Sequence, residues 1–459
     1  MLIERLTHAL PASALVFGDD VRRRSGNVWG TPRPTLADVL IRPATTEELS
    51  IALAICHDLS QPVVVQGGQT GVVGSTATQP GDVILSLERL SKIEEVDSIG
   101  QTMTAQAGVT LQRAQEAANE HGMLLGIDLG ARGSATLGGN ASTNAGGNRV
   151  IRYGMTRRHI LGFEAVLADG TVLSSMNKVI KDNAGYDLKQ LFIGSEGTLG
   201  VISRLVFQLL PAPKTRNTAM VTAASFDCVA QLLVGLNTQL GGSLSAFEVL
   251  WSEYYTLVTT PPAGSRAPLP QGQPFYALVE SHGVDEHYDD ERFERALANA
   301  MDNLLIDDAV IAQTSAESDA LWALRDDVHQ LLRLKPMFLF DVSMPIAAME
   351  SYVECLRQQL KVRWNDAQLF IFGHLGDGNL HVCVSAGAED GREGSNVADL
   401  VLKSLGPIHG SVSAEHGIGF ERKAYLSVTR SAAEIDMMRK LKGLFDPRNI
   451  LNRGRIFDV

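Results

Sequence analysis

The middle of the sequence contains the same order of predicted elements twice, and no other feature restricts the fold as strongly. The first copy reads as strand, helix, strand, strand, helix and strand over residues 221–224, 226 onward, 244–250, 275–280, 289–304 and 309–313. The second copy has the same order over residues 338–344, 348–362, 369–374, 380–385, 397–405 and 411–413. This βαββαβ order is that of a ferredoxin-like unit. We therefore predict that the two copies form one broad antiparallel sheet covered by helices.

The first two hundred residues have a different pattern, in which short apolar strands alternate with amphipathic helices and glycine-rich turns. The predicted helices and strands include residues 45–59, 62–66, 83–87, 110–121 and 161–167. A chain of 459 residues exceeds the size at which one hydrophobic core usually keeps growing. The sequence therefore predicts two or three packed units.

The composition argues against several classes of function. Hydrophobic residues make up 45% and charged residues 20%, as in ordinary globular proteins, and the net charge of −12 without a basic tail argues against a nucleic-acid partner. The longest apolar runs, at 338–340 and 369–372, are far too short to span a bilayer, and the N-terminus lacks a signal-peptide pattern. The four cysteines form no CxxC pair. We therefore expect a soluble, cytoplasmic protein with no transmembrane segment.

Two histidines flank an Asp-Gly turn in the second copy of the repeat. If Asp377 and Gly378 are the central residues of a two-residue hairpin, His374 lies directly opposite His381. Opposed side chains of an antiparallel pair have Cβ atoms about 4.5–5.5 Å apart. Both imidazoles could therefore bind one divalent metal at the usual distance of about 2.0–2.1 Å.

Glu415 and His416 could complete such a site with a carboxylate and a third imidazole. Two His and one Glu would leave a catalytic zinc ion with an open position. The alternative interpretation is that these are surface histidines near turns.

Three glycine-rich loops punctuate the first two hundred residues. They cover residues 66–74, 130–147 and 194–200. Glycine allows a backbone to approach a pyrophosphate closely and to direct N–H groups at it. None of the loops fits G-x-G-x-x-G or G-x-x-x-x-G-K-[ST], so neither a nicotinamide Rossmann site nor a P-loop is indicated. A single loop of this kind is more often only a turn, but three loops with Ser, Thr and Asn between the glycines favour one large cofactor.

These loops and the histidine segments resemble a known flavoprotein family. The resemblance to the FAD-binding domain of the vanillyl-alcohol oxidase / p-cresol methylhydroxylase (PCMH) flavoproteins rests on residues 64–74, 126–154 and 194–201. The resemblance to the D-2-hydroxy-acid dehydrogenase branch, with its D-lactate, glycolate and D-2-hydroxyglutarate dehydrogenases, rests on residues 373–381, 414–419 and 446–454. Together these segments extend over nearly the whole chain.

The resemblance implies an α+β fold. A two-subdomain, PCMH-type FAD-binding domain would cover residues 1–212, and a substrate- and metal-binding cap domain would cover residues 213–424. The cap domain would contain the large antiparallel sheet built from the two ferredoxin-like halves. Residues 425–459 would form a C-terminal helical segment that returns to the FAD site. In that family the isoalloxazine ring faces the cap domain, and a metal, usually zinc, lies over the ring.

The resemblance also implies roles for individual residues. His374, His381 and Glu415 resemble the metal ligands, and His416 resembles the catalytic base that takes the proton of the substrate hydroxyl. Arg325 resembles the catalytic arginine that binds the α-carboxylate, and His329, one turn later, is a further candidate for substrate binding. The implied FAD contacts are Gln66, Gly67, Gly68, Gln69, Thr70, Gly71, Gly74, Gly133, Ser134, Gly138, Gly139, Asn140, Thr143, Asn144, Gly146, Gly147, Tyr153, Gly154, Glu196, Gly197, Gly200, Val201 and Asn452.

The first glycine loop predicts how the flavin is attached. Relatives with a histidyl-linked flavin commonly carry R-G-G-G-H-S in this loop, and the corresponding run here ends with Thr70. A threonine cannot form that bond, so we expect non-covalent FAD.

The substrate is where the sequence departs from the family pattern. Enzymes specialised for 2-hydroxyglutarate resemble one another in a lysine two residues before the position of Asp341, where this chain has Leu339, and often in an asparagine where it has Cys383. Both changes remove polar groups that could meet a second carboxylate, and this favours a small or apolar D-2-hydroxy acid. His329 or the nearby Arg333 could still supply charge, so D-2-hydroxyglutarate is weakened as a candidate without being excluded.

The function that follows is FAD-dependent, zinc-assisted oxidation of a D-2-hydroxy acid to the 2-oxo acid. Oxygen, a quinone, a cytochrome or an electron-transfer flavoprotein would each be compatible as electron acceptor, and a homodimer is possible because relatives are often dimers. Two alternatives stay open: the flavoprotein subunit of a multi-subunit glycolate oxidase, and a non-redox enzyme of the same flavin fold.

Overall fold

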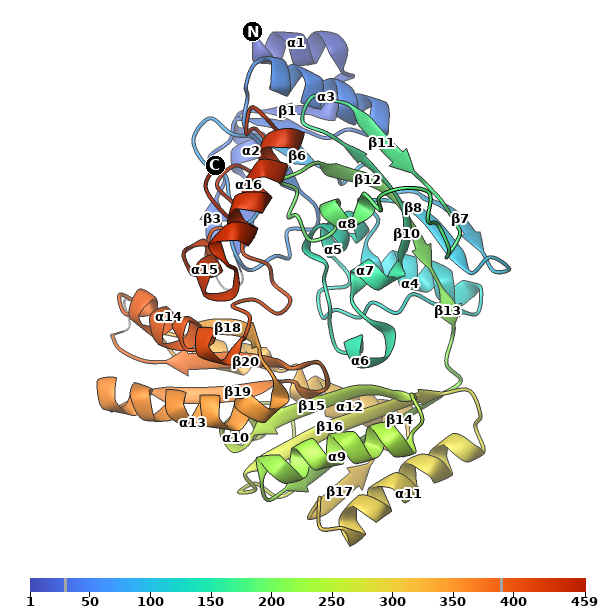
Figure 1. Cartoon of the computed structure of the whole chain (residues 1–459), viewed down its shortest axis with the longest axis vertical. Helices are drawn as coiled ribbons and strands as arrows, with labels where there is room; N and C mark the ends of the chain where they lie inside the picture. Colours follow the sequence, from blue (N-terminus) through green and yellow to red (C-terminus); the bar gives the residue numbers. More distant parts are fainter. Residues whose placement is uncertain (29–30, 389–390) are drawn as a thin grey trace. The chain divides into compact units, whose positions relative to one another are not determined.

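The computed structural model describes residues 1–28, 31–388 and 391–459, which divide into two compact units (Figure 1). The first unit consists of Met1–Gly147, Gly154–Ala212 and Glu415–Val459. The second consists of Asn148–Tyr153 and Pro213–Ala414. A short piece of the N-terminal half is therefore part of the second unit, and the last 45 residues, 415–459, return to the first.

Two sheets form the framework of the first unit. A four-stranded sheet has the order β1-β4-β6-β5, with β4, β6 and β5 parallel. A five-stranded antiparallel sheet has the order β11-β10-β12-β8-β7, and two small ribbons pair β2 with β3 and β9 with β13. The strands are β1 Leu15–Phe17, β2 Ser25–Val28, β3 Thr31–Pro34, β4 Val39–Ile41, β5 Val63–Gln66, β6 Val83–Ser86, β7 Ile93–Asp97, β8 Thr102–Gln106, β9 Met123–Leu124, β10 Ile160–Val166, β11 Val172–Ser175, β12 Val201–Gln208 and β13 Leu210–Pro211.

Amphipathic helices cover these sheets. In α3 the buried residues include Leu49, Ala52, Leu53 and Cys56, whose spacing places them on one helix face against the four-stranded sheet. The hydroxyl of Thr45 caps this helix by accepting from the N–H of Glu48 at 3.2 Å. The helices of the unit are α1 Leu2–Ala9, α2 Asp19–Arg22, α3 Thr46–Asp58, α4 Leu111–Glu120, α5 Leu137–Thr143, α7 Thr156–His159, α8 Lys189–Phe192, α15 Leu426–Thr429 and α16 Ala432–Phe445, with short 3₁₀ turns at Ala12–Ala14 and Lys423–Tyr425.

The second unit is built on one seven-stranded sheet in the order β17-β14-β16-β15-β19-β20-β18. Every pair of neighbours in it is antiparallel, which confirms the predicted broad antiparallel sheet. Its strands are β14 Thr215–Ala223, β15 Leu244–Trp251, β16 Phe275–Gly283, β17 Asp308–Ile311, β18 Phe338–Ser343, β19 Gln368–His374 and β20 Asn379–Ser385. The helices are α6 Val150–Tyr153, α9 Phe226–Gln239, α10 Ser252–Thr259, α11 Tyr288–Asp302, α12 Ser315–Arg325, α13 Ile346–Arg363 and α14 Gly394–Lys403, with 3₁₀ turns at Val328–Arg333, Leu375–Asp377 and Gly406–Ile408.

The strand order shows how the two repeat copies join. Strands β17, β14, β16 and β15 belong to the first copy, and β19, β20 and β18 belong to the second. The copies meet where β15 pairs with β19, and Glu248 lies opposite His374 at this junction. The predicted last strand of the second copy, residues 411–413, is reduced to a single bridge between Ser343 and Ser411. The second copy is therefore an incomplete ferredoxin-like half.

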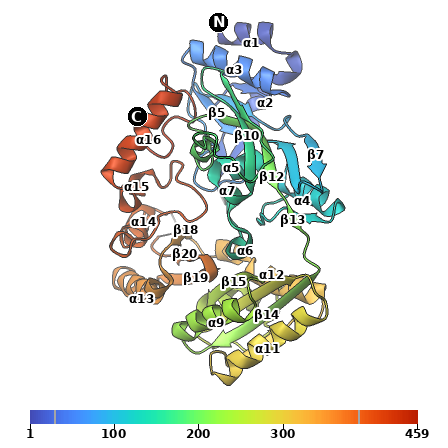
Figure 2. The same cartoon turned by 45° about the vertical axis from the view of Figure 1, so that its right-hand side comes forward.

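The two faces of this sheet are covered differently. Figures 1 and 2 show α9 and α11 side by side on one face. The other face packs Leu250, Phe370 and Phe372 against Tyr254 of α10 and Trp322 of α12 in one apolar cluster. This second face also carries Glu248 and the histidine pair, because residues two apart in a strand point to the same side.

The C-terminal segment completes the first unit. Helix α16 begins with a capping box between Ser431 and Glu434. The segment after it adds to the edge of the four-stranded sheet through a parallel bridge between Val63 and Leu451. Among the helices of the described residues, none has the length and apolar character needed to cross a membrane.

Candidate functional site

The strands that carry the two histidines pair in a register that differs from the predicted one. His381 lies opposite Phe372 and not opposite His374. The connection is a 3₁₀ turn, Leu375–Asp377, followed by Gly378 at φ +82°, so the predicted two-residue turn is wrong. The shift from 374 to 372 is even, and both imidazoles therefore stay on one face. Their ring centroids are 5.3 Å apart.

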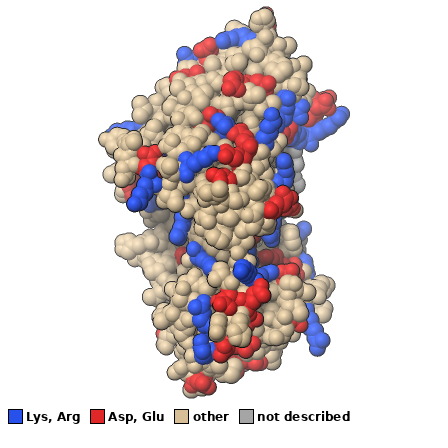
Figure 3. All heavy atoms as spheres, turned by 90° about the vertical axis from the view of Figure 1, so that its right-hand side faces the viewer, with Lys and Arg blue, Asp and Glu red and all other residues tan. Residues whose placement is uncertain are grey.

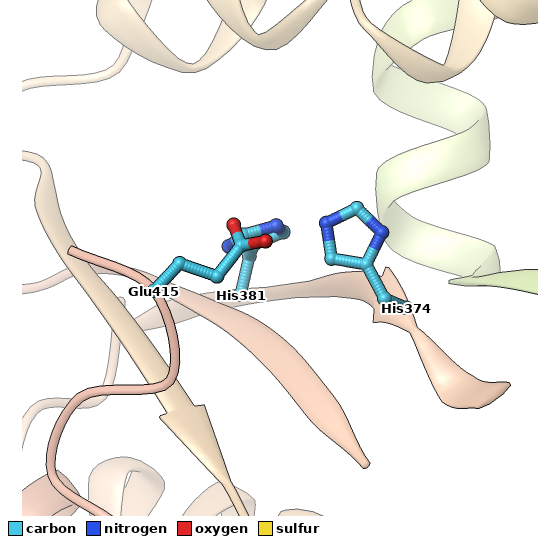
Figure 4. A group of neighbouring side chains, drawn as sticks. All are labelled: His374, His381 and Glu415. Atoms are coloured by element: carbon cyan, nitrogen blue, oxygen red, sulfur yellow. The ribbon is translucent and has the colours of Figure 1, made fainter. Parts of the chain in front are cut away.

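Glu415 is the third residue of this group. His374, His381 and Glu415 each offer one ligand atom, and these atoms all lie within 4.8 Å of one another. Figure 4 shows the three side chains directed toward one another. Glu415 is bonded to Ala414, the last residue of the second unit, whose N–H donates to the buried carboxylate of Asp341 at 3.2 Å. Two imidazoles and a carboxylate form a donor set that suits zinc and leaves a position open.

A buried carboxylate, that of Glu248 in β15, connects His374 with Arg325. Oε1 of Glu248 lies 2.7 Å from Nδ1 of His374, and Oε2 accepts from Nε and Nη2 of Arg325 at 2.8 and 2.7 Å. Burial alone would raise the pKa of Glu248, but the charge of Arg325 and the hydrogen bonds from His374 and Arg325 lower it to about 2. Because an ionised carboxylate only accepts, this contact requires the proton on Nδ1 of His374, and in the neutral ring Nε2 then carries the lone pair that a metal ligand needs.

Arg325 ends α12 and is almost completely buried, with 6% exposure. Its Nη1 lies 3.1 Å from Asp326, its Nη2 lies 3.2 Å from Nε2 of His374, and its guanidinium lies over the ring of Phe372 at 5.3 Å. The structure thus brings Arg325 to the histidines, while the binding of a substrate carboxylate stays a prediction. His329 lies in the 3₁₀ turn Val328–Arg333 and is exposed.

The first glycine loop leaves β5 and approaches the second loop closely. A Cβ at Gly68 would lie 1.8 Å from the carbonyl oxygen of Ser134, and one at Gly67 would lie 2.5 Å from Oγ1 of Thr136. Within the part of the chain that the structure describes, the backbone N–H groups of residues 67–71 have no hydrogen-bond partner. A row of such N–H groups at the end of a strand suits the pyrophosphate of a dinucleotide cofactor.

The second glycine loop offers a further donor. The side-chain nitrogen of Asn140 is buried and finds no partner among the described residues. Gly147 ends the loop at φ +119°, where a Cβ would lie 1.8 Å from the carbonyl oxygen of Asp128. The N–H of Gly147 donates to Oε1 of Glu415 at 2.6 Å. A loop predicted to bind FAD is therefore in direct contact with a predicted metal ligand.

The third loop is hydrogen-bonded to the C-terminal segment. Nδ2 of Asn452 donates to the carbonyl oxygen of Glu196 at 2.7 Å, and its Oδ1 accepts from the N–H of Val65 at 2.9 Å. Gly197 has φ +69°, and a Cβ there would lie 2.8 Å from Nδ2 of Asn452. The amide of Asn452 thus joins β5 to the third loop.

Other predicted FAD contacts have partners within the protein. Oγ1 of Thr143 donates to the carbonyl oxygen of Gly139 at 3.1 Å, and Oδ1 of Asn144 accepts from the N–H of Arg157 at 2.9 Å. Tyr153 belongs to the second unit, whereas the glycine loops belong to the first.

Segment 148–153 is held in the second unit by polar contacts. Oη of Tyr153 lies 2.8 Å from Nδ1 of His282. Arg149 donates through Nε to the fully buried Glu280 at 2.8 Å, and Nε of Arg216 donates to the same carboxylate at 2.8 Å. This segment follows directly after the second glycine loop in the chain.

Sequence reasoning did not assign Glu248 or Glu280 to any role. Each is the only charged residue in its run, LSAFEVLW for residues 244–251 and FYALVES for residues 275–281. An isolated carboxylate in a strand that is otherwise apolar is costly to bury without partners. A single charged residue in an apolar strand was therefore the sequence signal that could have marked Glu248 and Glu280 as candidate site residues.

Charge is mixed on the face of the protein that Figure 3 shows. Lys and Arg side chains alternate there with Asp and Glu side chains, and neither sign forms a continuous area. This mixed distribution, in a chain with a net charge of −12, is unlike the basic surface of a nucleic-acid-binding protein.

Comparisons with known proteins indicate the family of the chain. The family "FAD linked oxidases, C-terminal domain" matches residues 212–456, and "FAD binding domain" matches residues 37–175. D-2-hydroxyglutarate dehydrogenase, mitochondrial, of Bos taurus is 39% identical over 90% of this chain and 76% of that protein. D-2-hydroxyglutarate dehydrogenase of Xanthomonas citri pv. viticola is 36% identical over 98% of this chain and 93% of that protein.

The comparison with solved structures supports the fold. Crystalline p-cresol methylhydroxylase with substrate bound has a TM-score of 0.77 and 15% identity, covering 100% of this chain and 96% of that chain. This likeness confirms the predicted α+β fold with a PCMH-type FAD-binding domain. The sequence matches show that the chain belongs to the FAD-linked D-2-hydroxy-acid dehydrogenase family.

Proposed function

We propose that this protein oxidises a D-2-hydroxy acid to the 2-oxo acid with non-covalent FAD and a divalent metal, most simply zinc. The observation that carries the proposal is the group His374, His381 and Glu415, with ligand atoms within 4.8 Å of one another. Arg325 lies at the same site, 3.2 Å from His374. The two imidazoles and the carboxylate, the buried guanidinium of Arg325 and the family membership together suit a substrate that carries a hydroxyl beside a carboxylate.

Each residue of the site would have a distinct role in the reaction. His374, His381 and Glu415 would hold the cation, which when bound makes a coordinated hydroxyl more acidic. His416, the next residue after Glu415, would take the hydroxyl proton. Arg325 would orient the α-carboxylate. FAD supplies the acceptor for the hydride that leaves C2.

The glycine loops support the binding of FAD by the first unit. The free N–H groups of residues 67–71 and the buried amide of Asn140 provide neutral donors for a pyrophosphate and its neighbours. Thr70 in the first loop has no imidazole nitrogen with which to form a histidyl-type flavin bond, so the FAD should dissociate on denaturation. We propose residues 1–212 as the FAD-binding domain, 213–424 as the cap domain and 425–459 as the returning segment.

The face of the sheet beside His381 bears on which acid is oxidised. Leu339 lies directly opposite Cys383, as Asp341 lies opposite His381, so Leu339 and Cys383 are on the same face as the histidine. Cys383 is 2% exposed and belongs to the apolar cluster on this face. This lining favours D-lactate or a larger apolar D-2-hydroxy acid, although the two relatives above are D-2-hydroxyglutarate dehydrogenases.

Three further points remain predictions. Oxygen, a quinone, a cytochrome or an electron-transfer flavoprotein is compatible as the electron acceptor, and a homodimer is a possible assembly. The cytoplasmic location also stays a prediction, because the bovine relative is described as mitochondrial.

One experiment tests the proposed function. The purified protein is mixed under anaerobic conditions with D- and L-2-hydroxy acids, including lactate, 2-hydroxyglutarate and longer apolar analogues, while flavin absorbance is followed. Metal content is measured on the same sample. We expect flavin reduction by D-acids only and about one metal ion per chain. A flavin that stays oxidised with every acid would disprove the proposal.

A further inference from the structure

The carboxylate of Glu196 is bonded to the turn that follows His416. Oε1 of Glu196 accepts from the N–H of Ile418 at 2.7 Å, and Oε2 accepts from the N–H of Gly419 at 2.9 Å. Oε2 also accepts from the hydroxyl of Ser75 at 2.8 Å. Glu196 is 6% exposed, so these bonds are shielded from water. A buried carboxylate with donors on both oxygens is a rigid attachment point.

Two glycines, Gly417 and Gly419, allow this turn to approach Glu196 and Val73 closely. Gly417 has φ +82°, and a Cβ there would lie 2.8 Å from Oε1 of Glu196. Gly419 has φ +48°, and a Cβ there would lie 2.2 Å from the carbonyl oxygen of Val73. The same carbonyl accepts from the N–H of Phe420 at 3.0 Å. The turn is therefore fitted against the first and the third glycine loops.

Glu196 itself is held in an unusual conformation. Its φ is +52°, in the left-handed region that residues other than glycine rarely adopt. Its own N–H donates to the carbonyl oxygen of Ser142 at 2.8 Å, and its carbonyl oxygen accepts from Asn452 at 2.7 Å. Backbone strain of this kind persists only where several contacts enforce it. Here the contacts aim the carboxylate at the turn.

We propose that Glu196 is a positioning residue for proton transfer, because it fixes the turn 417–419 and thereby the place of His416 relative to the glycine loops. This inference rests on the proposed function, in which His416 takes the hydroxyl proton. All of the groups involved belong to the first unit. A general base must stay within hydrogen-bond reach of its proton, and a displacement of about 1 Å can slow a reaction about a hundredfold.

This role differs from the one that the sequence resemblance implies for Glu196, which is a contact with FAD. Both carboxylate oxygens already accept hydrogen bonds from Ser75, Ile418 and Gly419. The third loop thus contributes its carboxylate to the protein and not to the cofactor.

The test uses the substitution Glu196→Gln in the FAD-loaded full chain. Glutamine has the same shape, but one of its two terminal groups is an NH₂, so the N–H of either Ile418 or Gly419 would face a second donor. The same substitution is also made in a His416→Ala background. Measurements are FAD content, the rate of anaerobic flavin reduction at saturating substrate across pH, and hydrogen exchange at residues 417–420.

The proposal predicts a specific combination of results. Glu196→Gln should keep FAD content within about twofold, slow flavin reduction by about tenfold or more, and speed amide exchange in the turn, with substrate KM nearly constant. In the His416→Ala background the same change should alter the rate by less than about twofold, because the residue it positions is gone. Equal slowing in both backgrounds, unchanged exchange in the turn, or loss of FAD would overturn the positioning role.

Two controls separate this inference from the proposed function and from misfolding. Glu421→Gln changes an exposed carboxylate of the same segment, which pairs with Arg33, and should leave all three measurements unchanged. Ser75→Ala removes only the third hydrogen bond to Glu196 and serves if Glu196→Gln does not fold; it should slow reduction by about two- to fivefold, again only when His416 is present. If wild-type flavin is not reduced by any acid, the proposed function fails, whereas failure of the variants alone rejects only the role of Glu196.

Discussion

Oε1 of Glu248 lies 2.7 Å from Nδ1 of His374, and this contact decides which nitrogen of the imidazole can bind a metal. Glu248 is 1% exposed, so no water competes for its oxygens. The carboxylate holds the proton on Nδ1 and leaves the lone pair on Nε2. Partners of this kind orient metal-binding histidines in many metalloproteins.

Glu248→Gln should weaken metal binding by about 10- to 100-fold, because the amide cannot accept from both His374 and Arg325. The measurement is titration of the metal-depleted protein with zinc. Glu253→Gln in α10, a partly exposed carboxylate that pairs with Arg357 at 2.6 Å, is the matched control. Equal zinc affinity in wild type and Glu248→Gln would rule out the orienting role.

Removal of any one ligand should release the metal and spare the flavin. His374→Ala, His381→Ala and Glu415→Ala are each expected to lower bound metal well below one ion per chain and to abolish turnover, since Zn²⁺ needs three protein ligands at a catalytic site. The flavin absorbance of the purified variants should match wild type. If FAD is lost while metal remains, the three residues belong to the flavin site. His416→Ala should retain the metal and lose rate.

Arg325 is expected to affect stability as well as substrate binding. Its side chain is buried against the carboxylate of Glu248, so Arg325→Met leaves a buried charge without its partner and should cost about 3–5 kcal/mol of unfolding free energy. The KM for the acid should also rise. Urea unfolding and steady-state kinetics measure the two effects. The double substitution Arg325→Met with Glu248→Gln should recover part of the stability, and KM should stay high.

The fold was largely predictable because it depends on local patterns. Apolar runs of strand length, separated by amphipathic helices, occur in the same order twice, and this was enough to predict one antiparallel sheet in the second unit. The predictions of the hairpin turn and of the partner of His381 were wrong, because they depend on turn geometry. An Asp-Gly pair is compatible with more than one turn, and here Gly378 ends a 3₁₀ turn, which moves the partner of His381 from His374 to Phe372.

The candidate site was predictable only where its residues carry a local motif. His374 and His381 flank one turn, and Glu415 and His416 are adjacent, so the sequence singles them out. Glu248 is 77 residues from Arg325 and 126 residues from His374; the pairing of β15 with β19 brings it to His374, and the packing of α12 on the sheet brings it to Arg325. A contact of such sequence separation has no signature in the chain except the cost of burying its charge.

The pH dependence of stability should reveal the buried carboxylate of Glu280. Burial raises its pKa, but the hydrogen bond to His282 and the charge of Arg149 outweigh burial and lower the pKa well below 4.5. A lowered pKa stabilises the fold above pH 4.5, and this contribution is lost as the pH falls below that value. Glu280→Gln should therefore cost about 3–5 kcal/mol near pH 7 and progressively less below about pH 4.5. Urea unfolding at several pH values measures this difference, and a constant difference would contradict it.

Leu339→Lys should shift the preference of the enzyme toward D-2-hydroxyglutarate. Leu339 lies opposite Cys383 on the face that carries His381, so an ammonium group there can approach a distal carboxylate that the present apolar lining leaves unpaired. A charged hydrogen bond gained in this way is worth about 1.5–3 kcal/mol, which corresponds to about a tenfold or greater rise in kcat/KM for D-2-hydroxyglutarate relative to D-lactate. Val362→Lys adds the same charge at a position that is 90% exposed and should leave the ratio unchanged. If Leu339→Lys lowers kcat/KM for both acids equally, Leu339 supports the core and does not select the substrate.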